Sequence, residues 1–450
     1  MFDKKIFQSH IREFLIDSLA ICEENSEKLD IDEIKWPIFF SNGKYKKYEI
    51  TKTPDYDFFI RNSLKKEIQK LHSFQIIKKL LVTKEIQDYN KKLLGDVHEN
   101  FSVKPNFAED LPLKFLVVYL IKNKNFNFNK KNYQNSFDKF NKFLNNPLED
   151  EYVSPLFNFE SDINNTSVDI NGIKIRRLTN FEFYKFVNLD ENSNISNVYH
   201  NLTHVMEIKF ESFNLDSGHK VVKEKFKNLI NSLSLFNNGN PQFGTIFRNI
   251  NNPWFHFDSS NEKNINKLEN LKFKKCDKNK LVLISKLINQ IDFSKKENKF
   301  LDIAISRFTN ALTRTDKVDQ FIDLMISLEA LFAPGNKGEI TTKLSTRLAT
   351  LIAKNEKQRE DYWLFIKKMY NLRSGIIHGE GFRSTEINGV KYEIDDCLEK
   401  IIELTRESIL QMLKLSIKYS GNNKISKICD DIDSAMINKK NLQELRLKLR

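Results

Sequence analysis

From about residue 263 onward, one segment after another of the chain has a helical pattern, and this feature most constrains the fold. Apolar residues recur there every three or four positions, the period of one face of an α-helix. Short turn signals divide the pattern into segments at 279–292, 296–314, 317–333, 339–354, 356–378, 392–419 and 424–448. Short connections of this kind predict an all-α helical bundle.

The chain before residue 263 has a mixed pattern that includes strands. Asn171-Gly172 separates two short alternating runs, which predicts a hairpin with a type I′ turn. Residues 205–210 also read as a strand, whereas the apolar run at 115–121 fits either a buried strand or a short buried helix.

We therefore predict an α+β fold with two parts. The first is a mixed, β-containing region over residues 1–262, with room for two subdomains, and the second is an all-α domain over residues 263–450. A chain of 450 residues is too long for one ordinary core, which agrees with more than one domain.

Charge and cysteine content narrow the class of partner and the compartment. The net charge of +12 favours polyanions such as nucleic acid, although a chain rich in Lys and Asn is basic without any such partner. The four cysteines have no CxxC spacing, which fits a reducing compartment and predicts no zinc site.

The first residues lack the apolar core of a signal peptide, and no apolar run could span a bilayer. We expect a cytoplasmic protein without a membrane partner, cofactor or metal.

The segment at 356–378 carries two stripes of different character. One stripe is apolar at Tyr362, Ile366 and Met369, and Arg373 follows at the same helical spacing. A polar stripe at three- and four-residue spacing comprises Asn371, Ser374 and His378. An arginine on a buried stripe is costly unless it is paired or lies at a wet interface. Glu329, within the stripe of the 317–333 segment, needs a cation in turn, and Arg307, Arg347 and Arg373 are candidates; its simplest role is a buried salt bridge.

Arg373 and His378 are five residues apart, about 140° around an ideal helix at roughly 100° per residue. The two side chains of one straight helix therefore do not converge easily. Two copies of the helix about a two-fold axis could bring both pairs into one cleft.

Three segments in order resemble the ApeA-like branch of the HEPN domains. They are the helix with Leu328-Glu329-Ala330-Leu331, the segment 339–351 with Arg347, and Asn371 to Gly379 with its Arg-x4-His motif. The resemblance covers roughly residues 295–420. The Arg-x4-His spacing alone is common, but the upstream helix at the right distance makes the combination specific. The family tends to carry Asn, Asp or His directly after the arginine, so Ser374 is a departure that leaves the role of that position open.

The resemblance implies a helical domain that dimerises and places the Arg and His of both protomers in a shared cleft. Many members are metal-independent ribonucleases of prokaryotic defence systems. His378 would handle proton transfer and Arg373 would grip the scissile phosphate, with Ser374, Glu329 and Asn371 in support. Histidine has an ordinary pKa near neutrality, and a guanidinium can neutralise charge on a phosphoryl group. The RNA supplies its own 2′-OH as nucleophile, which gives a 2′,3′-cyclic phosphate and needs no metal.

The partners expected from this resemblance are an RNA substrate, a second copy of the chain in a homodimer or higher even oligomer, and a phage protein that triggers the effector. Residues 1–262 would sense that trigger, in an abortive-infection response.

Two other functions remain open at the level of sequence. A catalytically silent HEPN adaptor would use the same helices only to dimerise or bind RNA. A metal nuclease in the N-terminal region would use Glu207 and Lys209, which share one strand face, with Asp169 upstream. His200 and His204 are four apart, but structural or surface histidines are more common than a metal site at such a spacing.

Overall fold

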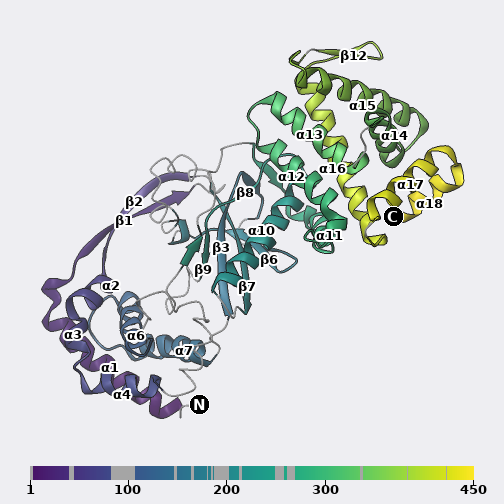
Figure 1. The fold of residues 1–450 in the computed structure, drawn as a ribbon. Coiled ribbons are helices and arrows are strands. Elements are labelled where there is room, and N and C mark those ends of the chain that lie inside the picture. The colour runs from purple at the N-terminus through teal and green to yellow at the C-terminus, as the bar shows by residue number, and fades with distance from the viewer. Residues whose placement is uncertain are drawn as a thin grey trace. The chain divides into compact units, whose positions relative to one another are not determined.

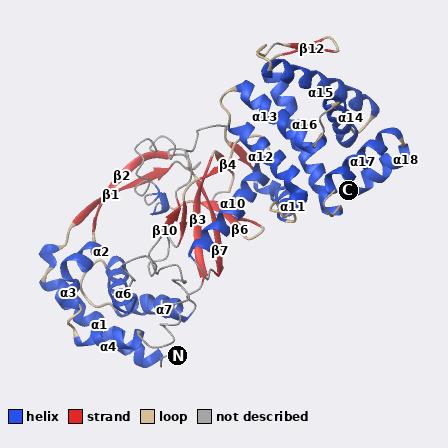
Figure 2. Ribbon diagram, in the orientation of Figure 1, coloured by secondary structure: helices blue, strands red, loops and turns tan. Residues whose placement is uncertain are grey.

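The computed structural model of the chain contains many helices and a smaller sheet region (Figure 1). It describes residues 4–39, 45–82, 107–145, 149–163, 167–179, 181–183, 186, 202–211, 215–248, 258–260, 269–334, 338–382, 384–421 and 423–449. The α+β prediction is confirmed, because strands are concentrated in the N-terminal region and helices dominate the C-terminal one (Figure 2).

The chain divides into two compact units that interleave along the sequence. The first unit consists of Met1–Leu156, Gly172–Lys225 and Phe243–Asn264. The second consists of Phe157–Asn171, Phe226–Gln242 and Ile265–Arg450. The boundary predicted between residues 262 and 263 lies in a stretch outside the described residues. The second unit thus includes two segments that come well before that boundary.

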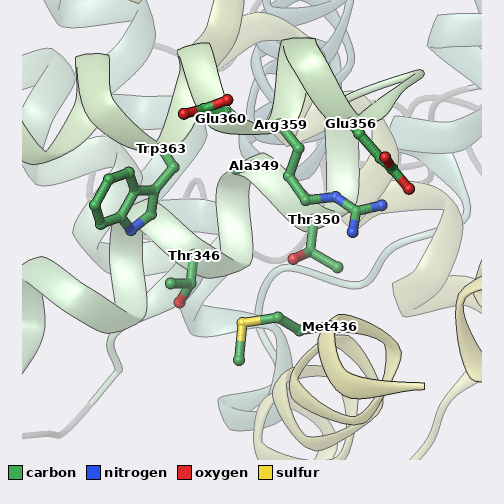
Figure 3. A pocket seen from close by; sticks show the side chains of 8 residues that line it. All are labelled: Thr346, Ala349, Thr350, Glu356, Arg359, Glu360, Trp363 and Met436. Atoms are coloured by element: carbon green, nitrogen blue, oxygen red, sulfur yellow. The ribbon is translucent and has the colours of Figure 1, made fainter. Parts of the chain in front are cut away.

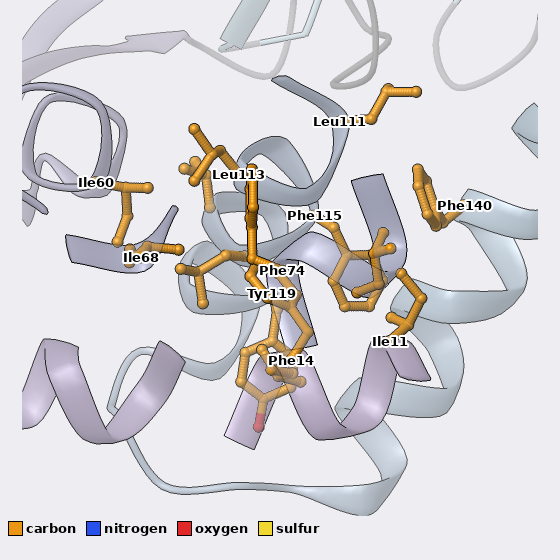
Figure 4. Packing of buried hydrophobic residues seen from close by; sticks show 14 of the residues in the cluster. Ile11, Phe14, Ile60, Ile68, Phe74, Leu111, Leu113, Phe115, Tyr119 and Phe140 are labelled. Atoms are coloured by element: carbon orange, nitrogen blue, oxygen red, sulfur yellow. The ribbon is translucent and has the colours of Figure 1, made fainter. Parts of the chain in front are cut away.

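The first unit contains a core of helices that is rich in phenylalanine. Its helices are α1 (Lys4–Glu24), α2 (Tyr56–Phe58), η2 (Phe59–Leu64), α3 (Lys65–Ile68), α4 (His72–Leu81), α6 (Phe107–Asn123) and α7 (Lys130–Asn145). Phe14, Phe74 and Phe115 are almost completely buried in this cluster (Figure 4). The ambiguous run at 115–121 is thereby settled as helix, since it lies within α6 and is apolar around most of its surface, as expected of a buried helix.

A seven-stranded sheet has the order β10-β9-β3-β7-β6-β5, and β8 pairs with β3. The strands are β3 (Glu149–Phe157), β5 (Ser167–Ile170), β6 (Ile173–Arg177), β7 (His204–Glu211), β8 (Gln242–Phe243), β9 (Ile246–Arg248) and β10 (Asp258–Ser260). The predicted hairpin joins β5 to β6. Asn171 and Gly172 both have positive φ, 52° and 84°, as a type I′ turn requires. The strand predicted at 205–210 is β7.

Three two-stranded pairs complete the strand content. They are β1 (Ile31–Phe39) with β2 (Tyr45–Pro54), β4 (Phe159–Ser161) with β11 (Leu271–Phe273), and β12 (Thr385–Ile387) with β13 (Val390–Tyr392). Inside the second unit, the backbone at Gly239 lies very close to the backbone of Leu271. A Cβ there would lie 2.4 Å from the backbone of Leu271, so only glycine fits.

Helices dominate the second unit, which also contains the short strands β4, β5, β11, β12 and β13, and the helices match the predicted segments closely. They are α11 (Lys278–Asn289), α12 (Lys299–Thr313), α13 (Lys317–Phe332), α14 (Ile340–Ile352), α15 (Glu356–Ile377), α16 (Ile394–Lys418), α17 (Lys424–Ile437) and α18 (Lys439–Leu449). The second half of α10 (Leu215–Phe236) also belongs to this unit. Contacts run along the pairs α12–α13, α14–α15, α13–α16 and α14–α17.

The segment predicted at 424–448 is two helices rather than one. The backbone is extended at Asn438. The side-chain oxygen of Asn438 accepts a hydrogen bond from the Lys440 N–H at 2.8 Å. Asparagine competes with the helix in this way, and it begins a new helix more readily than it continues an old one.

Polar contacts at Arg347 and Lys424 help to connect α17 to the rest of the bundle. Arg347, almost completely buried on α14, donates from Nε and Nη2 to the two carboxylate oxygens of Asp433 at 2.8 and 2.7 Å, and from Nη1 to the Phe332 carbonyl. The Lys424 ammonium, 4% exposed, donates to Asn298 at 2.8 Å. Its burial lowers the pKa of this lysine.

Within the described residues, no helix combines the length and apolar character that a bilayer span needs.

Candidate active site

The predicted motif lies at the C-terminal end of α15, and a glycine terminates the helix there. Gly379 has a φ of +89° and donates its N–H to the Ile376 carbonyl at 3.0 Å. The next N–H, of Glu380, returns to the Gly375 carbonyl, also at 3.0 Å. This is the Schellman arrangement, in which a residue in the left-handed region ends the helix. His378 is consequently the last residue before the chain turns away.

The Arg373 guanidinium faces the Glu329 carboxylate of α13. Nη1 lies 3.2 Å from Oε1 and Nη2 donates to Oε2 at 3.4 Å, and the two side chains are 20% and 22% exposed. Oε1 of Glu329 is buried and accepts no hydrogen bond from any described residue. Nε of Arg373 is also buried and donates none to any of them. The pair is therefore charge-balanced but long, and part of the hydrogen-bonding capacity of both groups is unused.

Tyr370, one helical turn before Arg373, completes this cluster. The centre of its ring lies 5.7 Å from the guanidinium carbon, a cation–π distance. Burial raises the pKa of Glu329, and the Arg373 charge and the Tyr370 hydroxyl oppose that rise. Burial and the nearby Glu329 carboxylate also raise the pKa of Tyr370. The local low dielectric thus outweighs the ion pair at Glu329.

This pKa shift predicts a pH dependence of stability. A folded-state pKa above the ordinary 4.5 means that the folded protein holds a proton that the unfolded chain has lost. The contribution of Glu329 to the free energy of unfolding should therefore decrease as pH rises above about 4.5, and level off beyond the folded-state pKa. Urea unfolding of the wild type and of Glu329→Gln across this range measures the difference. A difference that grows with pH would show that the Arg373 attraction dominates instead.

His378 lies at a different part of the helix end from this cluster. Its side chain is exposed, and within the described residues it makes no hydrogen bond or ion pair. No such contact joins Arg373 to His378, which agrees with the angular offset expected from their spacing. Ser374 is half-buried and accepts the His378 N–H with its carbonyl at 3.1 Å, whereas Asn371 is exposed.

The structure chooses among the three arginines that could have paired with Glu329. Arg307 donates to Asp323 at 2.8 Å, and Arg347 is committed to Asp433, so Arg373 is the partner. Sequence reasoning did not identify Tyr370 as part of the cluster. Its position three residues before Arg373 puts both on one helix face and could have indicated it.

The residues of the alternative metal nuclease are not brought together. Asp169 lies on β5 and Glu207 on β7, with β6 between them. Arg176 donates to Glu207 at 2.5 Å and also to the buried Glu182, so the Glu207 carboxylate is part of a salt-bridge network. Among the described residues, no group of three His, Cys, Asp or Glu side chains could hold a metal ion.

His200, the other histidine of the suggested pair, lies outside the described residues. His204 begins β7 and is almost fully buried. Its Nδ1 shares a hydrogen bond of 2.8 Å with the Thr203 hydroxyl, a structural contact.

Comparison of the chain with protein-family models, with curated proteins and with solved structures finds no match. The likeness to HEPN domains therefore rests on the motif residues and on the order of the helices that carry them.

Proposed function

We propose that this chain is a metal-independent endoribonuclease of the HEPN type. The observation that carries the proposal is the arrangement at the end of α15, where a half-buried arginine lies opposite a carboxylate and an exposed histidine ends the same helix. A fixed guanidinium can hold a phosphodiester, and an imidazole accessible to solvent can transfer the protons of 2′-OH attack.

The ion pair with Glu329 suits such a role for Arg373. Glu329 fixes the direction of a long side chain, so less conformational entropy is lost when a phosphate binds. About a fifth of the guanidinium side chain is exposed, which leaves a surface for a phosphate to approach. Glu329 is accordingly a positioning residue, and Arg373 and His378 are the groups that would contact RNA.

The offset between the two side chains supports a composite site. Arg373 belongs to the cluster with α13, while His378 faces solvent beyond the end of the helix. We propose that a second copy of the chain, packed against this helix end, supplies the histidine for one arginine and the arginine for the other histidine. The exposed Ile377 side chain, 53% accessible, gives this surface an apolar component.

The proposal extends to the biological setting that the family resemblance suggests. A homodimer or higher even oligomer would cleave RNA after a phage component engages residues 1–262. This part of the proposal is carried by the resemblance of the motif segments alone.

Cleavage in the presence of a chelator tests the chemistry. Purified wild type and Arg373→Ala are each incubated with a transcribed RNA in EDTA, and the same pair is expressed in cells whose RNA ends are sequenced. Only the wild type should generate new 2′,3′-cyclic phosphate and 5′-OH ends. Loss of wild-type cleavage in EDTA, or equal cleavage by Arg373→Ala, would contradict the proposal.

A further inference from the structure

A pocket of about 380 Å³ lies between α14, α15 and α17, on the first turns of the helix whose last turn carries Arg373. Small-molecule sites usually measure about 300–1,000 Å³, so the pocket lies within this range near its lower end. Its lining residues are Thr346, Ala349, Thr350, Glu356, Arg359, Glu360, Trp363 and Met436 (Figure 3).

Arg359 supplies the one cation among these lining residues, and its guanidinium has no hydrogen bond or ion pair to any residue that the structure describes. Its Nε is buried and makes no hydrogen bond among the described residues. None of the ion pairs within the described part of the chain involves its guanidinium, although Glu356 and Glu360 lie on the same helix. In the view of Figure 3 the guanidinium lies between the side chains of Thr350 and Glu356. A buried donor without an acceptor costs free energy that a bound anion would recover.

Three of the remaining lining residues are apolar or aromatic. Trp363 presents its indole, Ala349 and Met436 contribute hydrocarbon and sulfur, and 43% of Met436 is exposed. An indole favours stacking with another aromatic ring, and a thioether adapts to the edge of such a ring. A ligand that fills this space therefore combines a flat apolar body with one acceptor group for Arg359.

The charge at the pocket limits how many negative groups a ligand can carry. Glu356 and Glu360 are both exposed lining residues, so two carboxylates accompany the guanidinium, and the Lys367 ammonium lies 4.9 Å from the centre of the Trp363 ring. A polyphosphate would meet repulsion from both, whereas one carboxylate matches the fork of Arg359. We propose that this pocket is a binding site for a small aromatic monocarboxylate, distinct from the Arg373 site and independent of any ribonuclease activity.

Calorimetric titration of the full-length chain with 2-naphthoate tests the proposal, beside the neutral alcohol 2-naphthylmethanol. The acid should bind saturably and about tenfold or more tightly than the alcohol, as expected for a charge-assisted pair. Arg359→Gln should reduce the affinity for the acid to that for the alcohol, and leave the alcohol unaffected. Trp363→Leu should weaken binding of both, because stacking is common to them.

Lys357→Gln is the matched control, since Lys357 is exposed on the same turn and does not line the pocket. It should bind 2-naphthoate as the wild type does. Arg359→Lys keeps the charge without the planar fork and should give an intermediate affinity, which guards against a folding defect in the Gln variant. Absence of saturable binding at millimolar 2-naphthoate, unchanged affinity in Arg359→Gln, or displacement by adenosine triphosphate at equal concentration would each overturn the proposal.

Discussion

His378→Ala is expected to lower the rate of RNA cleavage by about 10²–10⁴-fold, the usual contribution of a positioned acid or base. The melting temperature should stay close to that of the wild type. The side chain is exposed and, among the described residues, forms no hydrogen bond or ion pair, so its loss removes little folding energy. Cleavage is measured by the release of fragments from labelled RNA in EDTA, and unfolding by circular dichroism.

His72→Ala provides the control for this substitution. His72 is an exposed histidine at the start of α4, in the first unit, and its removal should leave cleavage unchanged. Full activity in His378→Ala would eliminate the proposed proton transfer and favour a silent HEPN adaptor with a contaminating nuclease.

Mixing the two inactive variants tests whether the site is composite. A heterodimer of Arg373→Ala with His378→Ala retains one intact arginine and one intact histidine, on different chains. A site that combines groups from both protomers recovers part of the activity, whereas a site within one chain recovers none. The mixture is unfolded and refolded together so that the subunits exchange, and its cleavage rate is compared with that of each variant alone.

The largest effect on stability is expected from Arg347→Met. This substitution leaves the Phe332 carbonyl without its donor and the Asp433 carboxylate without its cation. Removing one partner of a fully buried ion pair costs more, but the Asp433 side chain is 41% exposed and partly screened by water. We therefore expect the free energy of unfolding to fall by about 2–4 kcal/mol. Methionine retains most of the side-chain volume, so the loss reflects the polar contacts rather than a cavity. The free energy of unfolding in urea measures it.

Lys343→Met is the matched control on the same helix. Within the described part of the chain, the ammonium of Lys343 makes no ion pair, so the change should stay within about 0.5 kcal/mol. Equal loss of stability in both variants would show that Arg347 acts through helix propensity rather than through its contacts with Asp433 and Phe332.

The helices of the second unit could be predicted because their ends have local causes. The Asp316 side chain accepts the Asp319 N–H at the start of α13, and the Asn355 side chain accepts the Gln358 N–H at the start of α15. Both helices therefore begin at a capping residue that can be recognised in the sequence. Asn171-Gly172 specified its turn in the same local way. Each of these signals involves residues within a few positions of one another, which is the range that periodicity and capping report.

Contacts between distant segments could not be predicted in this way. Glu329 had three candidate partners, and only the packing of α13 against α15 selects Arg373. The pocket around Arg359 likewise needs α17, some seventy residues further on. The break at Asn438 has a local signal, since this residue favours a cap and residues 438–441 are all polar, but the sequence carries no Gly or Pro there.

The place of α17 in the bundle affects where a shorter protein could be cut. The resemblance to HEPN domains ends near residue 420, yet Ile428 and Ile432 of α17 are completely buried and Lys424 contacts Asn298 at the start of α12. A fragment that stops at 420 would expose the surface that these side chains cover and leave the Arg347 guanidinium without its acid. The smallest part of this chain that can fold as a bundle therefore extends past the region that its motifs mark.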